Sequence, residues 1–261
     1  MKIVVCLKQV PDTTEIKIDP VKGTLIREGV PSIINPDDKA GLEAALTMKD
    51  KHGAEVIVLS MGPMQAEEAL REALAMGADR AILLSDFKFA GADTLATSTA
   101  LSYALKQLDY DFVITGRQAI DGDTAQVGPE LAEFLDLPQI TYAAGIDYKG
   151  DGVFHVTRKV EDRSYVLKVK APFVMTVLSD MNKPRYMSVP GIIEAYREKK
   201  IDLWTADTIK ADPARLGLKG SPTKVKESFA KALKQPGQLY EVDPQEATKI
   251  ILDKLLEKFV L

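Results

Sequence analysis

Cysteine and histidine are scarce in this chain, which has one cysteine and two histidines among its 261 residues. A single thiol excludes an internal disulfide, and it leaves too few ligands for an iron–sulfur cluster or a zinc site. Cys6 lies in an apolar run, which favours a buried structural thiol over a catalytic nucleophile. His52 precedes Gly53 at an expected helix end and His155 lies in an alternating strand pattern, so we interpret both as structural.

Long apolar runs and a net positive charge are also absent. No window approaches the roughly 18 to 20 apolar residues that a membrane-spanning helix needs, and the first apolar run is too short for a signal peptide. The formal net charge of −4 disfavours nucleic-acid binding. We therefore expect a soluble, cytoplasmic protein without membrane insertion. The sequence has neither a Walker motif nor a G-x-G-x-x-G fingerprint, so neither common phosphate signature applies.

The first half of the chain alternates between short apolar runs and helical patterns. Apolar, strand-like runs occur at residues 2–7, 56–60, 81–84 and 112–115. Helices are predicted from the Asn-Pro-Asp-Asp start at residues 35–38 to Gly53, from Pro63 to Gly77, and from Asp93 to about Leu108. The alternation predicts an α/β fold, with a mainly parallel sheet and helices on both faces.

The pattern changes after Pro138. Residues 140–148, 153–159 and 165–170 alternate like antiparallel strands, with a turn at 149–152, and residues 173–178 add an apolar strand to this extension. From Asn182 onward the chain reads as irregular, and an amphipathic helix closes it near residues 244–259. We divide the chain into an α/β nucleotide- or flavin-binding domain at 1–200 and a C-terminal arm at 201–261 that packs on a partner.

Ligands of open α/β sheets bind beyond the carboxyl ends of the strands, so the loops at those ends are the candidate site. The longest of them, residues 116–129, is polar and rich in small residues, which let backbone amides approach an anion. Thr124 and Gln126 can donate to a pyrophosphate. A solvated connection with Asp123 as a helix N-cap is the competing interpretation, and an ordinary N-cap is the competing one for Asn35.

Five segments resemble electron-transfer flavoprotein β subunits: residues 4–10, 35–36, 73–80, 116–128 and 182–192. The similarity runs in register to about residue 200. It implies a fold related to adenine-nucleotide α-hydrolases and a heterodimer with a larger FAD-binding α subunit. It also implies a nucleotide site on Cys6, Asn35, Asp37, Asp38, Met61, Gly116, Arg117, Gln118, Ala119, Ile120, Asp121, Gly122, Asp123, Thr124, Ala125, Gln126 and Val127.

The resemblance also separates two kinds of nucleotide. Many family members hold AMP, which does no chemistry, whereas the electron-bifurcating members of anaerobic metabolism hold a second FAD. Residues 122–128, Gly-Asp-Thr-Ala-Gln-Val-Gly, resemble the bifurcating kind. That kind implies hydride uptake from NADH, with electrons divided between ferredoxin or flavodoxin and, through the α-subunit FAD, an acyl-CoA or lactate-type flavin dehydrogenase. The flavin does this chemistry, so we name no catalytic acid or base.

Residues 184–195 resemble the family's recognition loop, which docks on the dehydrogenase. The expected contacts are Arg185, Tyr186, Met187, Val189 and Ile192, with Val189 as the apolar anchor. A loop packed on its own domain is the alternative from residue types alone. Two other functions stay open: a conventional single-electron carrier with structural AMP, and a stand-alone nucleotide-binding module, which the extension and the lysine-rich arm disfavour.

Overall fold

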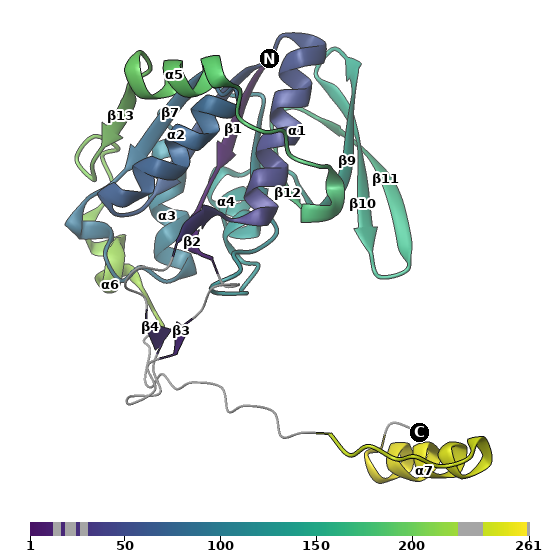
Figure 1. Cartoon of the computed structure of the whole chain (residues 1–261). Coiled ribbons are helices and arrows are strands. Elements are labelled where there is room, and N and C mark those ends of the chain that lie inside the picture. The colour runs from purple at the N-terminus through teal and green to yellow at the C-terminus, as the bar shows by residue number, and fades with distance from the viewer. Residues whose placement is uncertain (13–16, 19–24, 27–30, 224–236, 260–261) are drawn as a thin grey trace. The chain divides into compact units, whose positions relative to one another are not determined.

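The computed structural model describes residues 1–12, 17–18, 25–26, 31–223 and 237–259. Its first unit, residues 1–227, is built on a nine-stranded sheet in the order β11-β10-β9-β12-β8-β1-β6-β7-β13 (Figure 1). The strands are β1 (Lys2–Cys6), β6 (Glu55–Met61), β7 (Arg80–Leu84), β8 (Phe112–Gly116), β9 (Gln139–Gly150), β10 (Val153–Val160), β11 (Arg163–Lys170), β12 (Phe173–Val177) and β13 (Ile201–Trp204). The predicted α/β fold with a mainly parallel sheet is confirmed.

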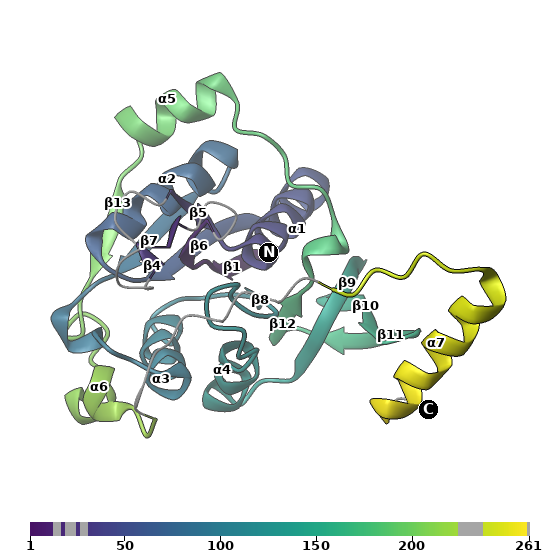
Figure 2. The same cartoon turned by 60° about the horizontal axis from the view of Figure 1, so that its bottom comes forward.

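Helices cover both faces of this sheet. The helices are α1 (Pro36–His52), α2 (Glu67–Met76), α3 (Thr94–Leu105), α4 (Val127–Leu135), α5 (Val189–Arg197) and α6 (Gly217–Gly220). Successive residues of β1 point to opposite faces, so Ile3 and Val5 pack in the core beneath α1 and α2, while Val4 and Cys6 pack in the core beneath α3 and α4. Figure 2 shows the two layers on either side of the strands.

The antiparallel extension is present at the edge of the sheet. Strands β9, β10 and β11 pair antiparallel in sequence order. Strand β12, which the sequence pattern assigns to the antiparallel extension, lies instead parallel to both β8 and β9. Phe112, Phe154 and Phe173 of β8, β10 and β12 join the extension to the main core, with centroids of Phe112 and Phe173 4.9 Å apart in a stacked arrangement.

The chain beyond Asn182 is more regular than predicted. Helix α5 forms there, and β13 then pairs in parallel with β7, so the sheet continues past the boundary proposed at residue 200. The first unit ends at Glu227. Part of the expected arm, residues 224–236, lies outside the described residues. The second unit contains α7 (Pro244–Glu257), close to the predicted closing helix.

Two small ribbons complete the first unit. Strands β2 (Gln9–Pro11) and β5 (Ser32–Ile34) pair antiparallel, as do β3 (Lys17–Ile18) and β4 (Leu25–Ile26). The β2–β5 pair brings the chain from the end of β1 back to the start of α1, which places the carboxyl end of β1 beside the helix N-terminus.

Candidate site at the carboxyl ends of the strands

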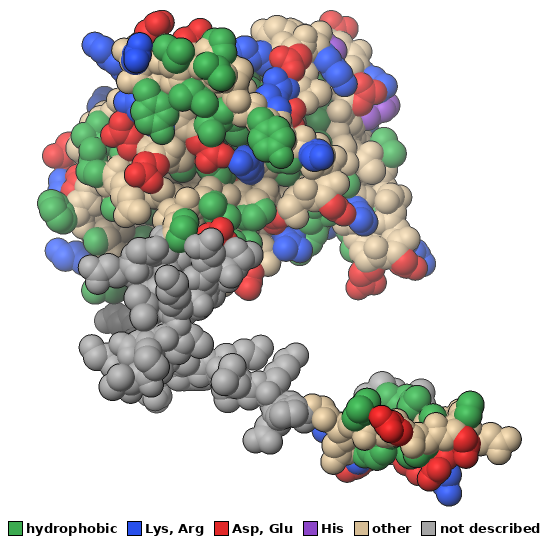
Figure 3. Space-filling model, in the orientation of Figure 1, with side chains coloured by type: hydrophobic (Ala, Val, Ile, Leu, Met, Phe, Trp, Pro, Cys, Tyr) green, Lys and Arg blue, Asp and Glu red, His purple; other side chains and the backbone are tan. Residues whose placement is uncertain are grey.

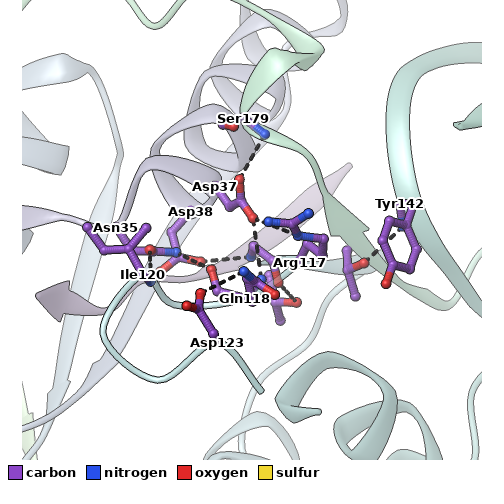
Figure 4. A network of polar contacts seen from close by, with 12 residues as sticks. Asn35, Asp37, Asp38, Arg117, Gln118, Ile120, Asp123, Tyr142 and Ser179 are labelled. Atoms are coloured by element: carbon purple, nitrogen blue, oxygen red, sulfur yellow. Dashed lines mark hydrogen bonds and ion pairs between the residues drawn. The ribbon is translucent and has the colours of Figure 1, made fainter. Parts of the chain in front are cut away.

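The order of the strands locates the candidate site. From β1 the chain continues to β6 and β7 on one side, and it then returns to β8 on the other side of β1. The carboxyl ends of β1 and β8 therefore form a topological switch point, where open α/β sheets bind their ligands. The N-terminus of α1 and the strand-end loop, residues 117–126, meet at this point (Figure 4).

Asn35 is fully buried at the start of α1 and ties the strand-end loop in place. Its side-chain Nδ2 donates to the Gln118 carbonyl at 2.8 Å, and its Oδ1 accepts from the Ile120 N–H at 3.1 Å. Asn35 occupies the N-cap position of α1, as the competing interpretation held, but its side chain makes no capping hydrogen bond to the helix. The residue shapes the loop that the sequence singled out.

Asp38 joins the ends of β1 and β8. Its Oδ1 accepts from the Gly116 N–H and its Oδ2 from the Lys8 N–H, both at 2.8 Å. Burial raises the pKa of this carboxyl to about 7, although the Lys8 and Gly116 N–H groups act to lower it. Burial, reinforced by the charge of Asp38, also raises the pKa of the Cys6 thiol to about 12, so Cys6 stays a neutral thiol and not an activated nucleophile.

Asp37 is also buried, and its two oxygens point to different segments. Oδ1 accepts from the Ser179 N–H at 2.9 Å. Oδ2 lies 3.4 Å from the Gln118 N and 3.5 Å from Arg117 Nε (Figure 4). Both carboxylates at the start of α1 are therefore turned toward protein donors, and they fix the backbone around the site.

The strand-end loop has an unusual backbone. Asp123 and Ala125 adopt positive φ angles of 49° and 52°, which non-glycine residues reach at a cost of about 1 kcal/mol or more each. The left-handed Ala125 is followed by the right-handed Gln126 at the start of α4. Alternation of this kind turns successive N–H groups toward one point, as in anion-binding nests, and the helix N-terminus adds a favourable dipole.

Side chains fix the remainder of the loop. Asp121 forms an ion pair with Lys8 at 2.7 Å, and Asp123 accepts from Gln118 Nε2 at 2.7 Å. Asp123 is thus not the N-cap of α4, whose cap position is Gln126. Thr124 is exposed and makes no side-chain hydrogen bond within the described part of the chain, so its hydroxyl is available to a ligand.

Two buried side-chain donors at this edge make no hydrogen bond among the described residues: Ser60 Oγ and Arg117 Nε, which forms only the ion pair with Asp37 Oδ2 at 3.5 Å. A contact of 3.5 Å is too long for a good hydrogen bond, and an anion beside Arg117 would accept one from its Nε. Ser60 precedes Met61, a partly exposed residue at the carboxyl end of β6. The donors present at this site therefore suit a phosphate group.

Thr94 is the residue at this edge that sequence reasoning missed. It begins α3, next to the capping Asp93, and its Oγ1 lies 3.1 Å from Gln126 Oε1 and 3.3 Å from Glu130 Oε1. The position of Thr94 in the sequence could have identified it. Residues 93–94 follow the apolar run of β7, and the carboxyl ends of parallel strands meet at one edge of a sheet.

The predicted docking residues lie away from this edge, on α5 and the segment before it. Tyr186 and Val189 are 93% and 72% exposed, and Met187 and Ile192 are also exposed. Ile193 and Tyr196, which the sequence reasoning did not name, extend the exposed apolar surface, and Figure 3 shows hydrophobic side chains gathered over this region. Arg185 instead pairs with Glu43 and Asp50 of α1.

Other kinds of site find little support in the described residues. They contain no cluster of three or more His, Cys, Asp or Glu side chains that could hold a metal ion. No helix among them is long and apolar enough to cross a membrane. A cavity of about 210 Å³ lies between α1 and β9, beside His52 and Asn182.

Fold and site together define an α/β protein with a phosphate-compatible loop at the switch point of its sheet. The family model described as "Electron transfer flavoprotein domain" matches residues 22–209, more than half of the chain. The chain belongs to the electron-transfer flavoprotein family and is a β subunit. The resemblance drawn from the sequence is thereby confirmed.

Relatives match along essentially the whole chain. An electron transfer flavoprotein subunit beta of Clostridium acetobutylicum is 57% identical over 258 residues, 99% of each chain. Subunit CarD of a caffeyl-CoA reductase-Etf complex of Acetobacterium woodii is 50% identical over the full length of both chains. An acryloyl-CoA reductase electron transfer subunit gamma of Anaerotignum propionicum is 44% identical, also over the full length of both.

Proposed function

We propose that this β subunit binds FAD at the carboxyl ends of β1, β6 and β8, and that its complex with the α subunit bifurcates electrons. In this proposal electrons from NADH divide between ferredoxin or flavodoxin and, through the α-subunit flavin, an acyl-CoA type dehydrogenase. The names of the relatives support the reductase partner, since two of them belong to complexes with CoA-thioester reductases. A lactate-type dehydrogenase is the second candidate for the partner.

The observation that carries the proposal is the loop between β8 and α4, whose backbone has the form of a nest, with Arg117 at its start making only a long ion pair of 3.5 Å with Asp37. These groups would hold the pyrophosphate of the nucleotide, with Thr124 as a further donor. Asn35 and Asp38 would keep the loop and the strand ends in register and thus pre-organise the site. Bound FAD supplies the chemistry that links a two-electron donor to one-electron carriers.

The same donors suit the phosphate of AMP, so a conventional carrier with structural AMP is the alternative function. NADH-driven reduction of ferredoxin by the heterodimer together with its dehydrogenase separates the two functions. Bifurcation predicts that ferredoxin is reduced only when the dehydrogenase and its CoA-thioester substrate are both present. NADH oxidation without any ferredoxin reduction under these conditions would favour the conventional carrier.

The C-terminal arm is proposed to pack on the α subunit. In α7 of the second unit, Ile251, Leu252 and Leu256 are exposed, although they are apolar. An exposed apolar helix surface favours association with another chain. The exposed surface of Val189 and its neighbours is proposed to dock on the dehydrogenase, because a small apolar patch rimmed by charge suits a transient interface.

A further inference from the structure

A tether of seven residues, 179–185, lies along α1 before the chain reaches α5 (Figure 1). Three hydrogen bonds set its register: Ser179 N to Asp37 Oδ1, Asn182 Nδ2 to the Ala40 carbonyl, and Arg185 N to Glu43 Oε2, each 2.9 Å long. The two partners are 142 residues apart in every pair. The tether therefore runs along α1 in a fixed register, in which every third residue of the tether contacts every third residue of the helix.

Glu43 makes the strongest of these contacts. Its carboxylate is mostly buried and accepts from the N–H, Nε and Nη2 of Arg185 at 2.9 Å. The hydrogen bonds of Arg185 to Glu43, and after them the one to Asp50, raise the pKa of its guanidinium. Charge-assisted, bidentate bonds in a buried setting are among the strongest polar contacts in proteins. Arg185 is thus an anchor of the tether more than a charge at the rim of the docking surface.

Asp37, at the other end of the tether, holds two segments at once. One carboxylate oxygen binds Ser179, while the other faces Gln118 and Arg117 of the strand-end loop (Figure 4). Movement of that loop when a phosphate binds Arg117 would change the surroundings of Asp37, and through it those of Ser179. Asp37 of α1 thus connects the proposed nucleotide site with the start of the tether.

The far end of the tether leads directly into the docking surface. Ser188 caps α5 by accepting from the Gly191 N–H at 3.0 Å. A Cβ at Gly191 would overlap the Ala75 carbonyl of α2, so α5 sits closely on that helix. With the tether fixed on α1 and α5 fixed on α2, Val189 and its neighbours are held on the outer surface.

We infer that Asp37 and Glu43 are positioning residues, which hold the docking surface in register with the nucleotide site through the tether. This inference rests on the proposed function. Asp37 was predicted to contact the nucleotide, but its oxygens both face protein donors. The buried acids on α1 therefore serve the geometry of electron delivery, in which the docking surface must present the partner at a fixed place.

Hydrogen exchange of the complete heterodimer tests the tether without any partner dehydrogenase. In Glu43→Gln the Arg185 amide, which donates to Glu43, should exchange about tenfold faster, because a charge-assisted contact in a mostly buried site is lost. Asp50→Asn is the matched control: Asp50 pairs with the same Arg185 but is more than half exposed, so exchange should change less than twofold. Equal effects of the two variants would overturn the role of Glu43.

Asp37→Asn tests the connection to the nucleotide site. In the wild type, adding FAD or AMP to nucleotide-stripped heterodimer should slow exchange at residues 178–182; in Asp37→Asn this response should disappear. A response of the same size in both proteins would overturn the connection. If neither nucleotide binds the wild type, the proposed function fails. The comparison of Glu43→Gln with Asp50→Asn still shows whether Glu43 holds the tether on α1.

The kinetics of electron delivery separate positioning from general structural damage. With an acyl-CoA dehydrogenase as acceptor, Glu43→Gln should raise the KM for the dehydrogenase about tenfold, while flavin reduction by NADH keeps its rate. Loss of flavin reduction together with delivery would show general damage and contradict positioning. Glu43→Asp, which keeps the charge on a shorter side chain, should restore part of the affinity.

Discussion

The Gly116 N–H donates to Asp38 Oδ1 at 2.8 Å, and a Cβ on Gly116 would overlap that same oxygen. The last residue of β8 and the third residue of α1 are therefore in direct contact, with no room for a side chain between them. This contact sets the distance between the carboxyl end of the sheet and the helix that begins the candidate site.

Gly116→Ala should destabilise the fold at this contact by about 1–3 kcal/mol, because the added methyl group forces Asp38 or the strand to shift. Chemical denaturation of the heterodimer measures the change, and nucleotide content should fall with it. Gly122→Ala is the matched control, since nothing lies within 4 Å of its added Cβ. An unchanged midpoint in Gly116→Ala would contradict the close approach.

Asp38 should make stability depend on pH near neutrality. Its folded-state pKa of about 7 lies above the ordinary value of 3.8, so the folded protein binds more protons than the unfolded chain between these values. The contribution of Asp38 is therefore fully present below about pH 4 and is lost as pH rises through 7, by on the order of 4 kcal/mol at most.

The measurement compares the free energy of unfolding between pH 5 and pH 8 in the wild type and in Asp38→Asn. The variant should lose this part of the pH dependence, although losing an acceptor lowers its stability at every pH. If both proteins show the same slope between pH 5 and pH 8, Asp38 does not titrate in this range.

Thr124→Ala combined with Gln126→Ala should weaken nucleotide retention, since both residues lie at the nest-shaped turn before α4. Losing two neutral donors predicts a loss of affinity of about tenfold. Nucleotide content of the purified heterodimer after dialysis reports the change. Thr124→Ser with native Gln126 keeps the hydroxyl and should retain the nucleotide. Full retention by the double variant would place the site elsewhere.

Much of this edge of the sheet was predictable from the sequence, because apolar runs identify parallel strands and the loops after such strands share one edge. The direction in which an individual side chain points could not be predicted from these patterns. Asn35 has the sequence context of an N-cap, yet its side chain reaches 83 residues along the chain to Gln118. No local pattern reports such a partner.

The sequence analysis also failed to predict the short elements near the edges of the sheet. The prolines after Asn182 indicated an irregular chain, but one of them, Pro190, lies in the first turn of α5, where proline is tolerated. Strand β13 has only four residues, which is too few for a clear alternating pattern; its pairing with β7 supplies the structure. Strand β12 was placed correctly as apolar, but its direction depends on a pairing that the sequence does not show.

Val189→Asp should block electron delivery to the dehydrogenase while flavin reduction by NADH continues. A carboxylate at the centre of an apolar interface loses its hydration on docking, which should lower delivery at limiting dehydrogenase by at least about tenfold. Val166→Asp on β11 is the matched control, because Val166 is 68% exposed and Val189 is 72% exposed. Delivery at the wild-type rate in Val189→Asp would remove this surface from the docking site.

The nucleotide content of the purified heterodimer, measured by extraction and chromatography of the bound cofactors, decides whether the β subunit holds FAD. We expect two FAD and no AMP per heterodimer, one FAD being held by this β subunit at the strand-end loop. One FAD with one AMP would contradict bifurcation and identify the protein as a conventional single-electron carrier.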